Sequence, residues 1–240
     1  MTPGCGDDEL HVWRTALAVG GDAYNGLASV LSRDERERAD RYHADTDRRR
    51  FVVARASLRN ILSWYTGVAP GALVFHHGEY GKPSLAAGSG DGCIRFNLSH
   101  SSDVALCAVT RCQDVGVDIE QVVEDLPAER IAAQFFSPPE QCLVGESENP
   151  AEAFARIWVR KEAYLKATGR GIGSDLSGFS VTLDRSEMFA LKDERGRSWT
   201  IQDLPAPSGY AAAVATPAPL RVSMREYSEL GDATRSRTPE

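Results

Sequence analysis

The 240-residue sequence predicts an α+β fold built from two similar halves. The first observation is the order of expected elements: strands and a long helix, then further strands, then helices, then strands again. The second is a change of pattern near residues 111–114, where the halves would join. The third is a pair of similar strand-like segments, VALCAVT at 104–110 and YAAAVAT at 210–216, which hints at an internal duplication.

The first half begins with a predicted strand over residues 10–19 and a loop over residues 20–26. Ser32 and Glu35 have the spacing of a capping box, which predicts the start of a short charged helix. Apolar residues at helical spacing predict a longer helix, which Gly67 ends. That helix covers residues 46–65, and three further strands are expected at 73–75, 94–98 and 104–110.

The second half is predicted to open with a strand and to continue with three helices, the last of which is ended by Gly169. The strand is expected at 115–120. The three helices are expected at 127–135, in the residues after Ser137, and at 150–168. Four more strands are expected at 179–183, 199–204, 210–214 and 220–224. The expected domains are 1–112 and 113–230, followed by a flexible tail over 231–240.

Composition limits the classes of protein to consider. With 42% apolar and 25% charged residues the chain can bury a sizeable core, and its net charge of −7 argues against a general nucleic-acid binder. The N-terminus has no signal-peptide pattern and the apolar runs are too short to cross a bilayer, so a cytoplasmic protein without a membrane span is expected. Five cysteines without a CxxC pair indicate reduced thiols, and no histidine has a partner at zinc-ligand spacing.

Arginines are concentrated in one segment of this acidic chain. Residues 33–59 contain nine arginines and six acids, a local charge of +3 that leaves −10 for the remainder. Such a patch suits a small polyphosphate ligand or an acidic partner. The alternative is a solvated helix with intra-helical ion pairs.

Two acids on the strand predicted at 115–120 form the first candidate site. Strand alternation puts Asp118 and Glu120 on one face and the intervening apolar residues on the other. Two such carboxylates offer hard oxygen ligands for Mg²⁺, which takes only one or two protein carboxylates together with substrate phosphates. An ordinary half-exposed strand gives the same pattern.

The helix predicted at 150–168 carries the second candidate site. Glu162 and Lys166 are one turn apart and face the same way, which either places an acid and a base at one site or forms an ordinary helix ion pair. Lys161 falls near the middle of the apolar stripe. A charge there is costly without an anionic partner, unless its long stem carries the ammonium out to water.

Two loops provide further candidate phosphate ligands. GKP at 81–83 offers Lys82 next to the stiff Pro83, and FNLSHS at 96–101 offers Ser99 and His100 where a strand ends. Glycine-proline turns and polar strand ends are also common without any ligand.

Taken in order, the segments GKP, FNLSHS, GVDIE, FFSPPE and WVRKEAYLKATGRG resemble the motif series of the 4'-phosphopantetheinyl transferases of the surfactin-synthetase-activating (Sfp) type. The resemblance runs from the arginine-rich segment to Phe179. It implies two pseudo-symmetric α/β lobes with the active site in the cleft between them. It also implies an enzyme of the holo-[acyl-carrier-protein] synthase kind.

The resemblance implies a role for each matching residue. The acids matching Asp118, Glu120 and Glu162 would hold Mg²⁺ against the pyrophosphate of coenzyme A, and Lys166 would contact the phosphates. Ser99 and His100 would contact the adenosine 3',5'-bisphosphate part, and Lys82 and Pro83 would line the same cleft. For the 3'-phosphate, Arg50 is the favoured contact; the less certain candidates are Arg38, Arg49 and Arg55.

The implied reaction transfers the 4'-phosphopantetheine arm of coenzyme A to a serine of an apo acyl, polyketide or peptidyl carrier protein, with release of adenosine 3',5'-bisphosphate. Such transfer needs positioning and charge neutralisation more than a protein nucleophile. Glu162 is the candidate general base. Because an acid that ligates a metal is a weak base, a metal-bound water is the alternative.

Several questions stay open at this point. A metal-dependent nucleotide pyrophosphatase or a non-catalytic carrier-binding module would share many of these residues. Mn²⁺ could replace Mg²⁺, since both accept oxygen ligands. A monomer is the default of the two-lobed family form, and the carrier and its docking residues are unassigned.

Overall fold

The computed structural model describes residues 4–88, 92–170, 175–181, 188–193 and 196–228. It has the predicted α+β architecture, with strands and helices gathered into two compact units. Unit 1 contains Met1–His77, Pro83–Cys112 and Arg221–Glu240, and unit 2 contains Gly78–Lys82 and Gln113–Leu220. The described helices include none that is both long and apolar enough to cross a bilayer.

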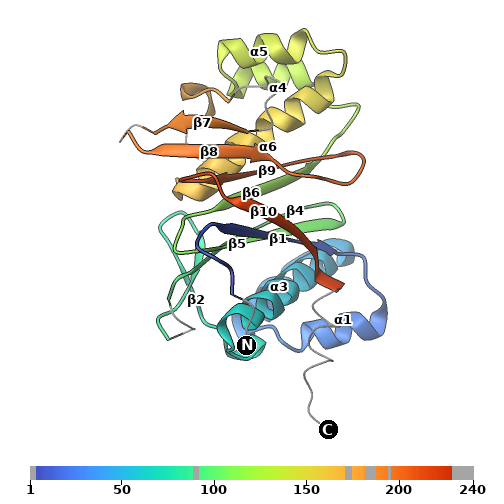
Figure 1. Ribbon diagram of the computed structural model, residues 1–240. Helices are drawn as coiled ribbons and strands as arrows, with labels where there is room; N and C mark the ends of the chain where they lie inside the picture. The colour runs from blue at the N-terminus through green and yellow to red at the C-terminus, as the bar shows by residue number, and fades with distance from the viewer. Residues whose placement is uncertain (1–3, 89–91, 171–174, 182–187, 194–195, 229–240) are drawn as a thin grey trace. The chain divides into compact units, whose positions relative to one another are not determined.

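Unit 1 is a four-stranded sheet covered by a long helix (Figure 1). The sheet order is β10-β1-β5-β4, in which β1 is antiparallel to β5 and parallel to β10. The strands are β1 (Glu9–Ala16), β4 (Ile94–Ser101), β5 (Val104–Arg111) and β10 (Arg221–Glu226). Helix α3 (Asp45–Thr66) buries Leu58, Ile61 and Leu62 against side chains of this sheet such as Trp13 and Val109.

The smaller elements of unit 1 agree with the sequence in part. Ser32 and Glu35 form the predicted capping box, and Gly67 ends α3 in the left-handed conformation. The loop expected over 20–26 is wrong, because residues there form α1. The remaining elements are α1 (Gly21–Ala28), α2 (Arg33–Ala39), the 3-10 helix η1 (Pro70–Ala72), and the paired strands β2 (Phe75–His77) and β3 (Pro83–Leu85).

Two further expectations for this unit need correction. Residues 220–224 were expected in the second half, but β10 pairs with β1 and completes the first sheet. Cys93 and Cys112 were expected as thiols, but they form a disulfide. The pairing of Ile94 with Arg111 explains the disulfide, since residues 93 and 112 follow directly at the same end of the β4–β5 ladder. Cys5, Cys107 and Cys142 are free thiols.

Unit 2 is a second four-stranded sheet with three helices. The order β6-β9-β8-β7 is antiparallel throughout, and α6 runs across one face (Figure 1). The strands are β6 (Gly116–Gln121), β7 (Met188–Lys192), β8 (Ser198–Asp203) and β9 (Tyr210–Thr216); the helices are α4 (Ala128–Phe135), α5 (Pro138–Gly145), α6 (Pro150–Thr168) and the 3-10 helix η2 (Leu176–Gly178).

Most elements of unit 2 fall where the sequence predicts them, including the end of α6 at Gly169. The strand expected over 179–183 is not formed by residues 179–181, and its last two residues lie outside the described part of the chain. Strand β7 was not predicted. The tail expected over 231–240 also lies outside the described residues.

Gly116 allows α6 to lie directly on β6. A Cβ atom at this position would overlap main-chain atoms of Ala163 and Ala167. Because alternate residues of a strand share a face, Asp118 and Glu120 lie on the same α6-facing side as Gly116. The close approach of helix and strand therefore decides where the two acids stand.

Candidate active site

Asp118 of β6 and Lys166 of α6 form the centre of the candidate site in unit 2. The Lys166 ammonium donates a hydrogen bond of 2.5 Å to Asp118 Oδ1. The Asp118 side chain is almost fully buried, whereas the lysine is partly exposed. The motif on the strand and the motif on the helix thus meet at this hydrogen bond, although the two residues are 48 apart in sequence.

Glu162 lies one turn before Lys166 and completes the cluster. Burial raises the pKa of its carboxyl, the negative charges of Asp118 and Glu120 raise it further, and the Lys166 ammonium lowers it. Its Oε1 is buried and accepts no hydrogen bond from the residues that the structure describes. Three carboxylates and one ammonium therefore share this site, and Glu162 has an oxygen available for a further cation.

The three acids fit a divalent cation by chemistry but are not pre-arranged around one. Carboxylate oxygens are the ligands that Mg²⁺ and Mn²⁺ prefer, and mutual repulsion among the acids favours a cation between them. However, the described residues contain one set of three Cys, His, Asp or Glu side chains with ligand atoms within 4.8 Å of one another, and it is a different set. In the described conformation the cation beside Asp118 is Lys166.

Lys82 joins the two elements that carry the cluster. Its ammonium donates to the carbonyl oxygens of Val115 at 3.1 Å and Ala167 at 3.0 Å. Val115 directly precedes β6, and Ala167 is in the last turn of α6. Lys82 therefore neutralises partial negative charge at the C-terminus of this helix. The GKP lysine thus contacts the main chain of the two segments that carry the acids.

Arg50, Ser99 and His100 lie together in unit 1. Arg50, in the first turns of α3, donates to Asp103 Oδ1 at 2.9 Å and to Ser102 Oγ at 3.4 Å. Ser102 and Asp103 form the turn that directly follows the end of β4, where Ser99 is buried and His100 is exposed. Pro83 is the first residue of β3 in the same unit.

The other arginine candidates are bound within unit 1. Arg55 donates two hydrogen bonds to the buried Glu35 carboxylate. Arg49 stacks over the ring of Tyr24, and Arg38 lies over Phe51. Arg50 is also ion-paired, to Asp103, so these contacts do not distinguish among the four candidates.

Lys161 has the anionic partner that its position in the apolar stripe requires. Its fully buried ammonium lies 2.8 Å from Glu140 Oε2 and donates to the carbonyl oxygens of Leu176 and Phe179. Burial lowers the pKa of Lys161, which Glu140 partly offsets. The lysine therefore does not reach water. The sequence could not reveal the partner, since Glu140 is on a separate helix.

The set with metal-ligand spacing is Cys5, Glu9 and His11 in unit 1. The Arg225 guanidinium already approaches His11 Nε2 at 3.0 Å, and burial raises the pKa of the Cys5 thiol to about 11. Because a guanidinium only donates, it occupies the nitrogen that a metal would need. This cluster is better described as a buried contact between β1 and β10.

Comparison with known proteins identifies relatives of this chain. Residues 114–215 match the family model of the 4'-phosphopantetheinyl transferase superfamily, and residues 20–112 match the N-terminal model of 4'-phosphopantetheinyl transferase. The 4'-phosphopantetheinyl transferase HetI of Nostoc sp. is 38% identical, with 87% of each chain covered. The transferase Sfp of Bacillus subtilis strain 168 is 29% identical over 84% of this chain and 90% of that relative.

The chain belongs to the 4'-phosphopantetheinyl transferase superfamily. Within it, the relatives HetI and Sfp and the two matching halves show the Sfp type. Neither a nucleotide pyrophosphatase nor an inactive binding module is supported by these relatives.

Proposed function

We propose that this transferase moves the 4'-phosphopantetheine arm of coenzyme A to a serine hydroxyl of an apo carrier protein. The serine oxygen forms a bond to the β-phosphorus, and the bond from that phosphorus to the bridging oxygen breaks, so adenosine 3',5'-bisphosphate leaves. The observation that carries the proposal is the convergence of Asp118, Glu162 and Lys166 from β6 and α6. Family membership supplies the reaction class.

Asp118, Glu120 and Glu162 are the proposed ligands of a divalent cation, either Mg²⁺ or Mn²⁺. When bound, this ion would neutralise charge on the pyrophosphate, which is the main requirement of phosphoryl transfer. The assignment is supported by the buried Glu162 Oε1, which accepts no hydrogen bond from the described part of the chain. Lys166 would then leave Asp118 and bind a phosphate oxygen, which its partly exposed ammonium permits.

Glu162 is also the proposed acceptor of the serine proton. Without a bound cation, burial raises the pKa of its carboxyl, whereas ligation of a cation would lower it, so a metal-bound water is the alternative acceptor. Glu162→Gln should lower turnover by about a hundredfold even at saturating Mg²⁺, because it removes the base and weakens a ligand. Normal turnover under those conditions would contradict the base role.

In unit 1 the proposed ligands of the adenosine 3',5'-bisphosphate part are Arg50, Ser99 and His100. Their support is their grouping at the start of α3 and the end of β4. Lys82 and Pro83 are proposed to border the site, with Lys82 fixing β6 to α6. We further propose holo-[acyl-carrier-protein] synthase activity by a cytoplasmic monomer.

Release of adenosine 3',5'-bisphosphate, followed by chromatography with and without an apo carrier protein, tests the reaction class. A transferase should release it only when carrier and coenzyme A are both present. Release without carrier would identify a pyrophosphatase, and no release with any carrier class would contradict transfer.

A further inference from the structure

An apolar groove in unit 2 is lined by residues of α6 and by Glu120 of the acid cluster. It has a volume of about 290 Å³. Leu126, Phe154 and Trp158 are among the apolar side chains that line it. Because Glu120 belongs to both the groove and the acid cluster, a molecule in the groove can contact one of the proposed metal ligands.

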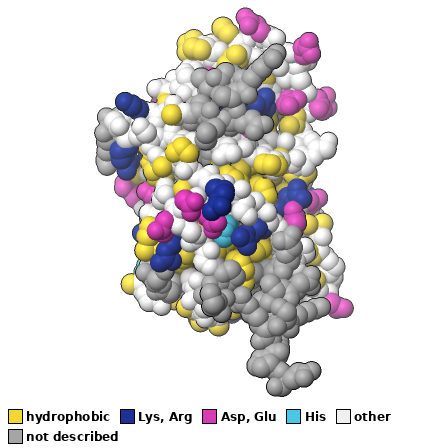
Figure 2. All heavy atoms as spheres, in the orientation of Figure 1, with side chains coloured by type: hydrophobic (Ala, Val, Ile, Leu, Met, Phe, Trp, Pro, Cys, Tyr) yellow, Lys and Arg dark blue, Asp and Glu magenta, His cyan; other side chains and the backbone are white. Residues whose placement is uncertain are grey.

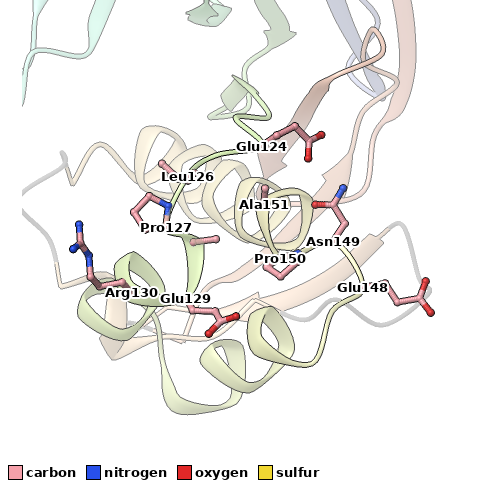
Figure 3. A pocket seen from close by; sticks show the side chains of 10 residues that line it. Glu124, Leu126, Pro127, Glu129, Arg130, Glu148, Asn149, Pro150 and Ala151 are labelled. Atoms are coloured by element: carbon pink, nitrogen blue, oxygen red, sulfur yellow. The ribbon is translucent and has the colours of Figure 1, made fainter.

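A second, wider hollow of about 620 Å³ continues from this groove, because Leu126 and Ala151 line both. Figure 3 shows its wall formed by the start of α4 and the start of α6, with Glu124, Glu129 and Glu148 around it on three different segments. The combined surface thus has an apolar floor and an acidic border.

The surrounding surface is acidic well beyond the hollow. Between residues 121 and 152 the exposed ionisable side chains comprise six acids and one base, Arg130. The acids are Glu124, Asp125, Glu129, Glu146, Glu148 and Glu152. Figure 2 shows acidic and hydrophobic side chains together over α4 and α5, at the top of the view. Val123, Phe135 and Leu143 are large apolar side chains exposed in the same region.

This charge pattern favours different surfaces for the two proposed substrates, coenzyme A and the carrier protein. Coenzyme A carries several phosphate charges, so the acidic border repels it, whereas the arginine-rich segment at 33–59 attracts it. An apolar surface with exposed aromatic side chains is typical of a protein-docking site, where such side chains contribute most of the binding energy. Phe135 is such a side chain, since it is 43% exposed and packs edge-on against the half-buried Trp158 of the groove, with ring centroids 6.4 Å apart.

We propose that this groove docks the carrier protein, and that it selects carriers whose surface beside the modified serine is apolar and flanked by lysine or arginine. The inference rests on the proposed transfer reaction and adds the charge of the preferred partner. Complementary charge raises the rate of encounter and suppresses partners of like charge. An acidic surface flanking the same apolar patch would be repelled.

The test uses one apo carrier domain in two forms, with lysines or glutamates at the same positions around its apolar patch. Both kcat/KM for transfer and Kd by fluorescence anisotropy are measured with the full chain. Wild type should favour the lysine form by about tenfold in each quantity, and high salt should reduce the difference. The variant E124K/E148K should reverse the preference, whereas D22K, an exposed acid of unit 1, should leave it unchanged.

Equal values for both carriers, or a preference that E124K/E148K does not alter, would overturn the proposal. If neither carrier is modified but the lysine form still binds more tightly, the docking proposal stands and the transfer reaction fails. Sedimentation velocity provides a further outcome. A dimer that E124K/E148K dissociates would assign this surface to a second copy of the chain, through its arginine-rich segment, and would contradict carrier docking.

Discussion

Asp118 is the residue on which the account of the site depends most. It is buried on β6, its Oδ1 is bound by Lys166, and its negative charge contributes to the raised pKa of Glu162. Both the strand position and the acidic character were predictable from the GVDIE motif. The partner Lys166 was predictable only as a neighbour of Glu162, because the strand-to-helix contact is not visible in sequence spacing.

Asp118→Ala should reduce metal-dependent transfer by about a hundredfold or more while the fold stays intact. Loss of the bond to Lys166 is offset by relief of repulsion on Glu162, so the free energy of unfolding should change by about 1 kcal/mol or less. Release of adenosine 3',5'-bisphosphate over a Mg²⁺ titration and urea unfolding measure the two quantities. Full activity of this variant would contradict the metal assignment.

His11 gives unit 1 a pH-dependent stability. Burial lowers the pKa of its imidazole below the ordinary 6.5, and the adjacent Arg225 lowers it further, while Glu9 raises it. Because Arg225 donates to Nε2, the proton of the neutral ring lies on Nδ1, beside the Tyr65 hydroxyl at 2.6 Å.

Below pH 6.5 the His11 side chain takes up a proton in the unfolded chain but not in the folded chain, where its pKa is lower. The contribution of neutral His11 to the free energy of unfolding is therefore complete above pH 6.5. It falls as the pH drops from 6.5 toward the pKa of the folded state. Urea unfolding between pH 8 and pH 5 measures this slope, and His11→Gln is the control that removes it. A wild-type slope identical to that of the variant would contradict a buried neutral histidine.

At the scale of elements, the contact between β6 and α6 sets the position of the acids. Gly116→Ala places a methyl group against main-chain atoms of Ala163 and Ala167, which cannot move as a flexible side chain would. We expect a loss of about 3 kcal/mol in the free energy of unfolding, together with lost transfer activity. Gly145→Ala, at a helical glycine with open space around it, should leave both unchanged. Equal effects of the two substitutions would contradict the close approach.

The elements also show why the sequence predicted some features and not others. Helices α3 and α6 were predictable because apolar side chains recur at helical spacing and Gly67 and Gly169 end them. Helix α1 was missed because its sequence, GDAYNGLA, contains two glycines that lower helix propensity. The partner of a strand depends on the three-dimensional fold, so the pairing of β10 with β1 was not predictable.

At the scale of the molecule, the chain forms two units whose sequence segments alternate. Unit 1 takes its fourth strand from the C-terminal part of the chain, and unit 2 takes Lys82 from a segment inside unit 1's range. The predicted ligands of the nucleotide lie in unit 1, whereas the acids, Lys166 and the proposed carrier groove lie in unit 2. The expected boundary at residue 112 therefore separates most of the site residues correctly. It does not follow the fold, because each unit contains a segment from the other side of that boundary.

The acid cluster is proposed to support metal-dependent transfer of phosphopantetheine to a carrier protein. Intact-mass spectrometry of an apo carrier, incubated with this protein, coenzyme A and Mg²⁺, measures it directly alongside samples that lack each component or contain EDTA. The carrier should gain one phosphopantetheine mass only in the complete mixture. A gain that persists in EDTA would contradict the role of the cation, and no gain across acyl, polyketide and peptidyl carriers would contradict the transfer itself.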